Sequence, residues 1–198
     1  QRLAVSTDGQ ESIPVGAGET RQVSVLARFL YGAAGAGLQT QGEARIMADP
    51  NPFPAFPGFE WGDQQTTFDE KFLELGSSVT DGDGKAILSL GTGDVGDTTA
   101  PLKATVTASV FEPGGRPVRE SLFLKVRTKP VYLGVKVEQT DATGGNAAPV
   151  ALNFIAVDSK GNRIAAPGAT YTLIAENWDY DWFQQDGRWQ WRRTSRDV

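Results

Sequence analysis

The clearest pattern in the sequence is a strict alternation of apolar and polar residues over positions 103–110. A period of two residues is typical of an antiparallel strand that buries one face. After a glycine-rich turn at 112–116, apolar residues alternate again over 118–126, so we predict a β-hairpin. The residues predicted to point inward are Ala104, Val106, Ala108, Val110, Leu122, Leu124 and Val126.

Short apolar runs of the same kind recur along the chain, separated by turns and by loops such as 91–99 and 141–147. Residues 66–75 fit a short helix or a strand equally well, and we assign a strand because their neighbours are strands. No segment keeps a helical period for more than about three turns, so we expect little helix. The further predicted strands cover residues 2–7, 19–30, 38–47, 66–75, 86–90, 131–138, 150–157 and 169–177.

The segment 49–59, here called the Pro/Phe loop, interrupts this strand pattern. It contains four prolines within eight residues, and prolines fix φ and supply no amide donor to a sheet. Phe53, Phe56 and Phe59 are interspersed with these prolines. We therefore predict an extended loop that its aromatic rings hold in place.

The order of strands and turns predicts an all-β chain of two antiparallel β-sandwiches in tandem. Lys129-Pro130-Val131 marks the boundary, which gives domains 1–130 and 131–198. A complete sandwich of the immunoglobulin or fibronectin type III kind has about 100 residues, so we expect the second domain to be incomplete at its C-terminus. Because the chain starts with Gln1, we expect it to be a fragment of a longer protein.

The last part of the chain predicts a hairpin whose register can be derived from its turn. Asp186-Gly187 suits a two-residue turn, which pairs Trp182 with Trp191 and Asp181 with Arg192. Charged residues then share one face, and the aromatic residues on the other are Trp178, Tyr180, Trp182, Trp189 and Trp191. Such a face forms a sandwich core when it is buried and a sugar-binding platform when it is exposed; we favour the core.

Composition excludes several classes of function. The chain of 198 residues has no cysteine, which excludes disulfides, thiolate metal sites and a cysteine nucleophile within it. It has no histidine, which excludes a Ser-His-Asp arrangement and imidazole ligands. A net charge of −5 argues against nucleic-acid binding. No apolar run reaches the roughly 18 residues that a membrane-spanning helix requires.

Two short motifs resemble binding sites, and both are better explained as turns. Residues 91–96 read GxGxxG, but the chain continues into a strand where a dinucleotide site requires a helix. Residues 81–84 begin like a calcium loop, but Lys85 and Thr92 occupy ligand positions. We therefore predict no enzyme activity, and no catalytic, cofactor or metal residues.

Several segments, taken in order, carry a family resemblance. The first is LYGAAGAGL at 30–38, followed by a strand and the Pro/Phe loop, and the others lie at 101–118, 132–136, 153–161, 171–173 and 180–189. Together they resemble the macroglobulin domains of bacterial α2-macroglobulins, and the resemblance covers most of 29–191. Ala34 stands where that family usually has proline.

This resemblance implies a structural part of a periplasmic protease trap, in which a protease cuts a bait segment and the domains rearrange to hold it. Its partners would be target proteases, through the full-length protein, and neighbouring macroglobulin domains; the full-length protein would be lipid-anchored to the inner membrane. Many members also tether the protease through a Cys-x-x-Gln thioester, for which this chain has no cysteine. The alternative from another class is a carbohydrate-binding or adhesin module that uses the Trp-rich hairpin.

Overall fold

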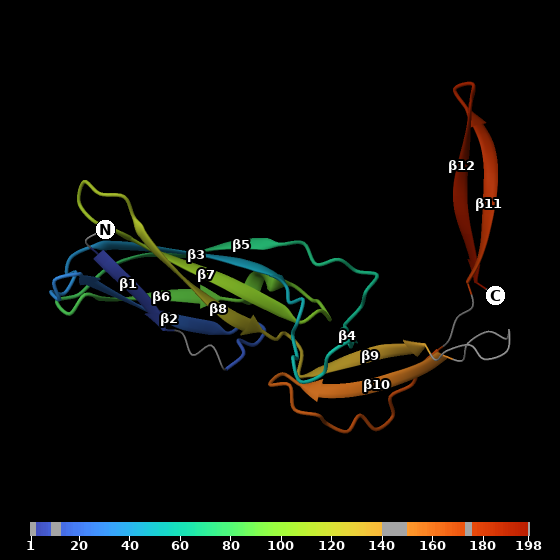
Figure 1. The fold of residues 1–198 in the computed structure, drawn as a ribbon, viewed down its shortest axis with the longest axis horizontal. Coiled ribbons are helices and arrows are strands. Elements are labelled where there is room, and N and C mark those ends of the chain that lie inside the picture. The colour runs from blue at the N-terminus through green and yellow to red at the C-terminus, as the bar shows by residue number, and fades with distance from the viewer. Residues whose placement is uncertain (1–2, 9–12, 140–149, 173–175, 198) are drawn as a thin grey trace. The chain divides into compact units, whose positions relative to one another are not determined.

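The computed structural model describes residues 3–8, 13–139, 150–172 and 176–197 (Figure 1). These residues form strands and one 3-10 turn, η1 (Gly93–Val95), and no α-helix occurs among them. The all-β prediction is confirmed; the loop expected at 141–147 lies outside the described residues. The strands are β1 (Leu3–Asp8), β2 (Thr20–Phe29), β3 (Gln39–Ala48), β4 (Glu60–Trp61), β5 (Lys71–Val79), β6 (Lys85–Gly91), β7 (Leu102–Phe111), β8 (Val118–Val126), β9 (Val131–Gln139), β10 (Val150–Asp158), β11 (Glu176–Gln185) and β12 (Arg188–Asp197).

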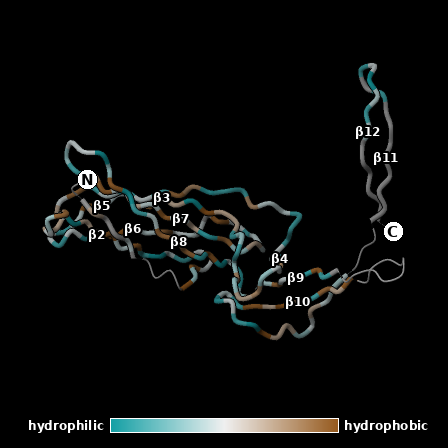
Figure 2. Tube along the Cα trace, in the orientation of Figure 1, coloured by the Kyte–Doolittle hydropathy of each residue, from teal (hydrophilic) through white to brown (hydrophobic). Residues whose placement is uncertain are grey.

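The first part of the chain is a sandwich of two antiparallel sheets. One sheet has the strand order β1-β2-β6, and the other has the order β5-β3-β7-β8. Apolar side chains from both sheets form the core between them. Along these strands hydrophobic and hydrophilic positions are interspersed, as Figure 2 shows. This is the pattern that a strand with one buried face requires.

The predicted β7–β8 hairpin is confirmed in detail. Ala104, Val106, Ala108 and Val110 are all completely buried, and Leu122, Leu124 and Val126 are at most 2% exposed. Val106 lies opposite Leu122 on β8 and opposite Ala44 on β3.

A β-bulge shapes the pairing of β3 with β5. The register shifts between Gly42 and Glu43, and Leu75 is the extra residue on β5. A side chain at Gly42 would point inward, where a Cβ would lie 2.7 Å from the Leu88 side chain and 2.9 Å from Leu75. Glycine is therefore required at position 42, and the bulge places Glu74 directly opposite Glu43.

A third sheet has the order β10-β9-β4; β9 and β10 follow the sandwich in the chain, whereas β4 lies between β3 and β5. Its strand β4 was not predicted, because it is two residues long and directly follows the Pro/Phe loop. Trp61 of β4 lies opposite Gly134 of β9, where an added Cβ would come within 2.8 Å of the indole ring. A separate small core forms on this sheet from Phe53, Trp61, Tyr132, Ile155 and Val157.

The predicted strand boundaries are wrong at two places. Residues 66–70 precede β5 without regular structure, and residues 169–172, which were predicted as part of a strand, also lack it.

The chain divides into two compact units, Gln1–Ala165 and Ala166–Val198. This division into compact units does not show which predicted sandwich each strand belongs to. The domain boundary between 130 and 131 therefore stays a prediction.

Candidate functional site

The Pro/Phe loop is held by its aromatic rings, as the sequence predicted. Phe53 is 5% exposed, and its ring centroid lies 4.6 Å from that of Trp61 and 5.6 Å from that of Tyr132. Phe56 and Phe59 lie 6.3 and 5.9 Å from Trp61, also centroid to centroid. These separations are typical of favourable aromatic pairs.

Arg127, the residue that follows β8, lies beneath this loop with a completely buried side chain. Its Nη2 donates to Asp49 Oδ2 at 2.9 Å and to the carbonyl of Pro52 at 3.0 Å. Its Nη1 donates to the carbonyls of Val126, at 3.1 Å, and Leu102. The guanidinium carbon also lies 5.2 Å from the centroid of the Phe53 ring.

These contacts explain how a charge is accommodated in the interior. A buried ion is costly unless it is paired and hydrogen-bonded, and Arg127 has a carboxylate and three carbonyl acceptors. Only its Nε is buried without a partner in the described structure. The acceptors belong to the start of β7, the end of β8 and the Pro/Phe loop. We call the set Asp49, Phe53, Trp61, Arg127 and Tyr132 the joint.

No pattern in the sequence singles out Arg127. Leu122, Leu124 and Val126 alternate inward along β8, so a neighbour of Val126 is expected to point outward into solvent. Arg127 is buried only because residues about 75 positions earlier fold over it, with Pro52 as the direct acceptor. That contact is long-range, and no local motif signals it.

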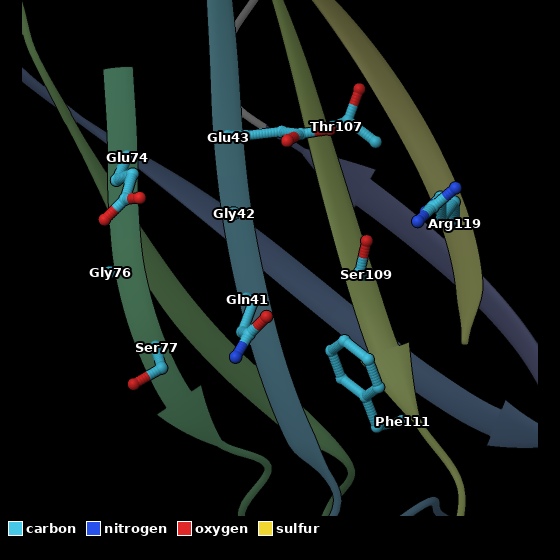
Figure 3. Close-up of a pocket in the computed structure, with 10 residues that line it drawn as sticks. All are labelled: Gln41, Gly42, Glu43, Glu74, Gly76, Ser77, Thr107, Ser109, Phe111 and Arg119. Carbon is cyan, nitrogen blue, oxygen red and sulfur yellow. The ribbon is translucent and has the colours of Figure 1, made fainter. Parts of the chain in front are cut away.

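A polar hollow of about 370 Å³ lies on the outer face of the four-stranded sheet (Figure 3). The register aligns its side chains in two rows, Glu74–Glu43–Thr107 and Ser77–Gln41–Ser109–Arg119. No ion pair with Glu43 or Glu74 occurs among the described residues, and the nearby Arg45 is bound by Glu70 at 2.6 and 2.8 Å. Charged side chains and hydroxyl groups line the hollow. The chain has no histidine that could act as a base toward these hydroxyl groups.

The register predicted for the hairpin of β11 and β12 is confirmed. Trp182 lies opposite Trp191, and Asp181 lies opposite Arg192. Asp186 and Gly187 both have positive φ, of 54° and 74°, as the tight turn requires.

The burial of the aromatic face is only partly described. Trp189 and Trp191 are 68% and 59% exposed, while the side chains of Trp178, Tyr180 and Trp182 lie outside the described set. The structural role of this face therefore stays a prediction.

The turn after β10 depends on the carboxylate of Asp158. Its Oδ1 accepts hydrogen bonds from the backbone amides of Lys160 at 2.9 Å and Asn162 at 2.8 Å. Its Oδ2 accepts one from the Asn162 side chain at 2.9 Å. The Asn162 side chain contributes most to lowering the pKa of Asp158, and the backbone amides add to it.

We predict that this turn loses its stabilisation in acid. Because the folded pKa of Asp158 is lowered, the stabilisation is complete above the ordinary aspartate pKa of about 4 and disappears as the pH falls through the lowered value. Urea unfolding measured at a series of pH values should show a smaller acid loss for Asp158→Asn. The exposed Asp69→Asn is the control, and an unchanged pH profile for Asp158→Asn would contradict the assignment.

Comparison with known proteins identifies the family of both parts of the chain. Residues 1–128 match the family model described as the bacterial alpha-2-macroglobulin MG5 domain. Residues 134–198 match the model described as bacterial macroglobulin domain 6. An alpha-2-macroglobulin of Xylella fastidiosa is 30% identical over 86% of this chain, and that of Escherichia coli is 26% identical over all of it.

Solved structures agree with this result. The chain is similar over its whole length to E. coli alpha-2-macroglobulin activated by porcine elastase, with 27% identity and a TM-score of 0.67, and covers 18% of that structure. The native E. coli protein, at 24% identity and a TM-score of 0.64, shows the same fold. The chain spans 10% to 13% of the length of the curated relatives. It belongs to the bacterial α2-macroglobulin family.

Proposed function

We propose that this chain is a structural scaffold segment of a bacterial broad-spectrum protease trap and has no catalytic activity of its own. The observation that carries the proposal is the succession of two macroglobulin-domain matches along the chain, over residues 1–128 and 134–198. The joint supports it, because its buried groups bind one another and leave no reactive side chain open to a substrate. A scaffold needs rigid sandwiches that keep their shape while other parts move.

The chain would contribute to trapping through the complete protein. A protease cuts a bait segment of that protein, and the domains rearrange. The present chain keeps its neighbouring domains correctly spaced. Its partners are the neighbouring macroglobulin domains and, through the complete protein, the target proteases. We place that protein in the periplasm, with a lipid anchor in the inner membrane. In the described part of this chain, no helix is long and apolar enough to cross a membrane.

The alternative function is a carbohydrate-binding or adhesin module on the Trp-rich hairpin. The exposure of Trp189 and Trp191 is the observation in its favour. The family matches favour the scaffold, in which this face is covered within the complete second domain.

A ligand titration separates the two functions. Soluble oligosaccharides and peptidoglycan fragments are added while tryptophan emission and melting temperature are followed. We expect no saturable change, because a scaffold face has no sugar to bind. A saturable shift that disappears in Trp191→Ala, with the fold retained, would establish the sugar-binding module. The matched control is Arg188→Ala on the other face of the hairpin.

A further inference from the structure

We propose that Arg127 is a latch that couples the Pro/Phe loop and the β10-β9-β4 sheet to the first sandwich. When the latch is broken, the loop and this sheet loosen while the sandwich remains folded. This coupling is a mechanical property of the chain and does not depend on protease trapping.

The composition of the loop limits how it can attach to the sandwich. Its prolines at 50, 52, 54 and 57 have no amide hydrogen, so the loop offers many carbonyl acceptors and few donors. It therefore cannot attach itself to the sandwich by a strand ladder. Asp49 is the last residue that does so, since its amide donates to the carbonyl of Pro101 at 2.9 Å. After Asp49, the hydrogen-bond donor that attaches the loop to the sandwich must come from a side chain.

The guanidinium of Arg127 has the chemistry that such a donor requires. A guanidinium presents five N–H groups in a planar fork, which suits several acceptors at once. Arg127 uses the fork to join the carbonyls of Leu102 and Val126, in the sandwich, to Pro52 and Asp49 in the loop. A lysine ammonium has only three donors on a single atom. It could not hold all four acceptors in this arrangement.

The loop is also attached to the β10-β9-β4 sheet. Through Phe53 the loop packs against Trp61 and Tyr132. Strand β4, which contains Trp61, pairs with β9 over only two residue pairs, and Gly62 adds one long hydrogen bond to Leu133 at 3.4 Å. Such a short pairing is weak unless the loop before it is fixed. Arg127 fixes that loop and so determines how firmly β4 stays on β9.

The charge balance makes the coupling cooperative. Asp49 is 13% exposed and is the only carboxylate that pairs with Arg127 among the described residues. If the loop moved away, the guanidinium would lose its counter-ion and the carbonyl of Pro52 at the same time, while Leu102 and Val126 stayed in place. Because both loop contacts are made by the same nitrogen atom, loop and latch should open and close together.

The test is amide hydrogen exchange on the 198-residue chain, comparing Arg127→Met with the unmodified protein. Met retains the apolar volume of the stem and removes every donor. Lys125→Met is the matched control, because Lys125 lies two residues before Arg127, on β8, with an exposed side chain. Arg127→Lys tests whether the fork is required. Asp49→Asn keeps the shape of the acceptor and removes its charge, and it serves if Arg127→Met does not fold.

We expect exchange at Gly62 and at the β4–β9 amides to accelerate about tenfold or more in Arg127→Met, with the β3–β7 amides unchanged. Asp49→Asn and Arg127→Lys should give the same pattern at smaller amplitude, and Lys125→Met should match the unmodified protein. Uniform acceleration across the sandwich would overturn the proposal, because Arg127 would then be a general stabilising residue. Unchanged exchange everywhere would overturn it too, because the rings alone would then hold the loop.

Discussion

Val106→Asp is expected to unfold the first sandwich, whereas Thr107→Asp leaves it folded. Val106 is completely buried between Ala44 and Leu122, so an aspartate there would have neither a partner nor water. Burying an unpaired carboxylate typically costs several kcal/mol, which is a large part of the stability of a whole domain. Thr107 is the next residue and points to the opposite face.

The control carries a small cost of its own. Thr107 lies opposite Glu43, so Thr107→Asp places a third carboxylate beside Glu43 and Glu74. Like charges directly opposite on a sheet are destabilising. Urea unfolding of both variants provides the measurement. Equal losses of unfolding free energy would show that the assignment of the two faces is wrong.

Gly84→Ala is expected to destabilise the sandwich by roughly 2–4 kcal/mol. Gly84 has a φ of +81°, and an added Cβ would lie 2.3 Å from the carbonyl oxygen of Ala27 and 3.0 Å from the amide of Gly35. Both neighbours are backbone atoms that cannot rotate away. The Gly84 carbonyl also accepts a hydrogen bond from the amide of Ala27 at 2.8 Å, so a shift would break that link between β2 and the turn.

Gly82→Ala, in the same turn, is the matched control. No atom lies within 4 Å of the position of its added Cβ, and its φ is not in the left-handed region. We expect its melting temperature to stay within about 2 °C of the unmodified protein, with a loss of several degrees for Gly84→Ala. If the two alanine variants had the same melting temperature, the turn would be more adaptable than the structure indicates.

Features that a few neighbouring residues determine were predictable from the sequence. The alternation over 103–110 defined both faces of β7, and Asp186-Gly187 defined the register of the last hairpin. The Pro/Phe loop followed from proline chemistry alone. In each case the determining residues are close together in the chain, so that local patterns are sufficient.

Features that depend on distant residues were not predictable. Strand β4 exists because β9, more than 70 residues later, supplies its partner. Arg127 is buried because the Pro/Phe loop folds over it, and the hollow of Figure 3 depends on a register that brings Glu43 opposite Glu74. Long-range packing determines these features, and a local sequence pattern does not indicate it.

The scaffold function is tested most directly by a trapping assay. A protease is incubated with the 198-residue chain alone and, separately, with the complete protein, and hydrolysis of a small peptide and of a large protein substrate is measured. Small substrates can diffuse to a protease that is enclosed in a trap, whereas large ones cannot. The complete protein should therefore reduce hydrolysis of the large substrate only. The chain alone should leave both rates unchanged and hydrolyse neither substrate. Inhibition by the chain alone, or hydrolysis without added protease, would contradict the scaffold function.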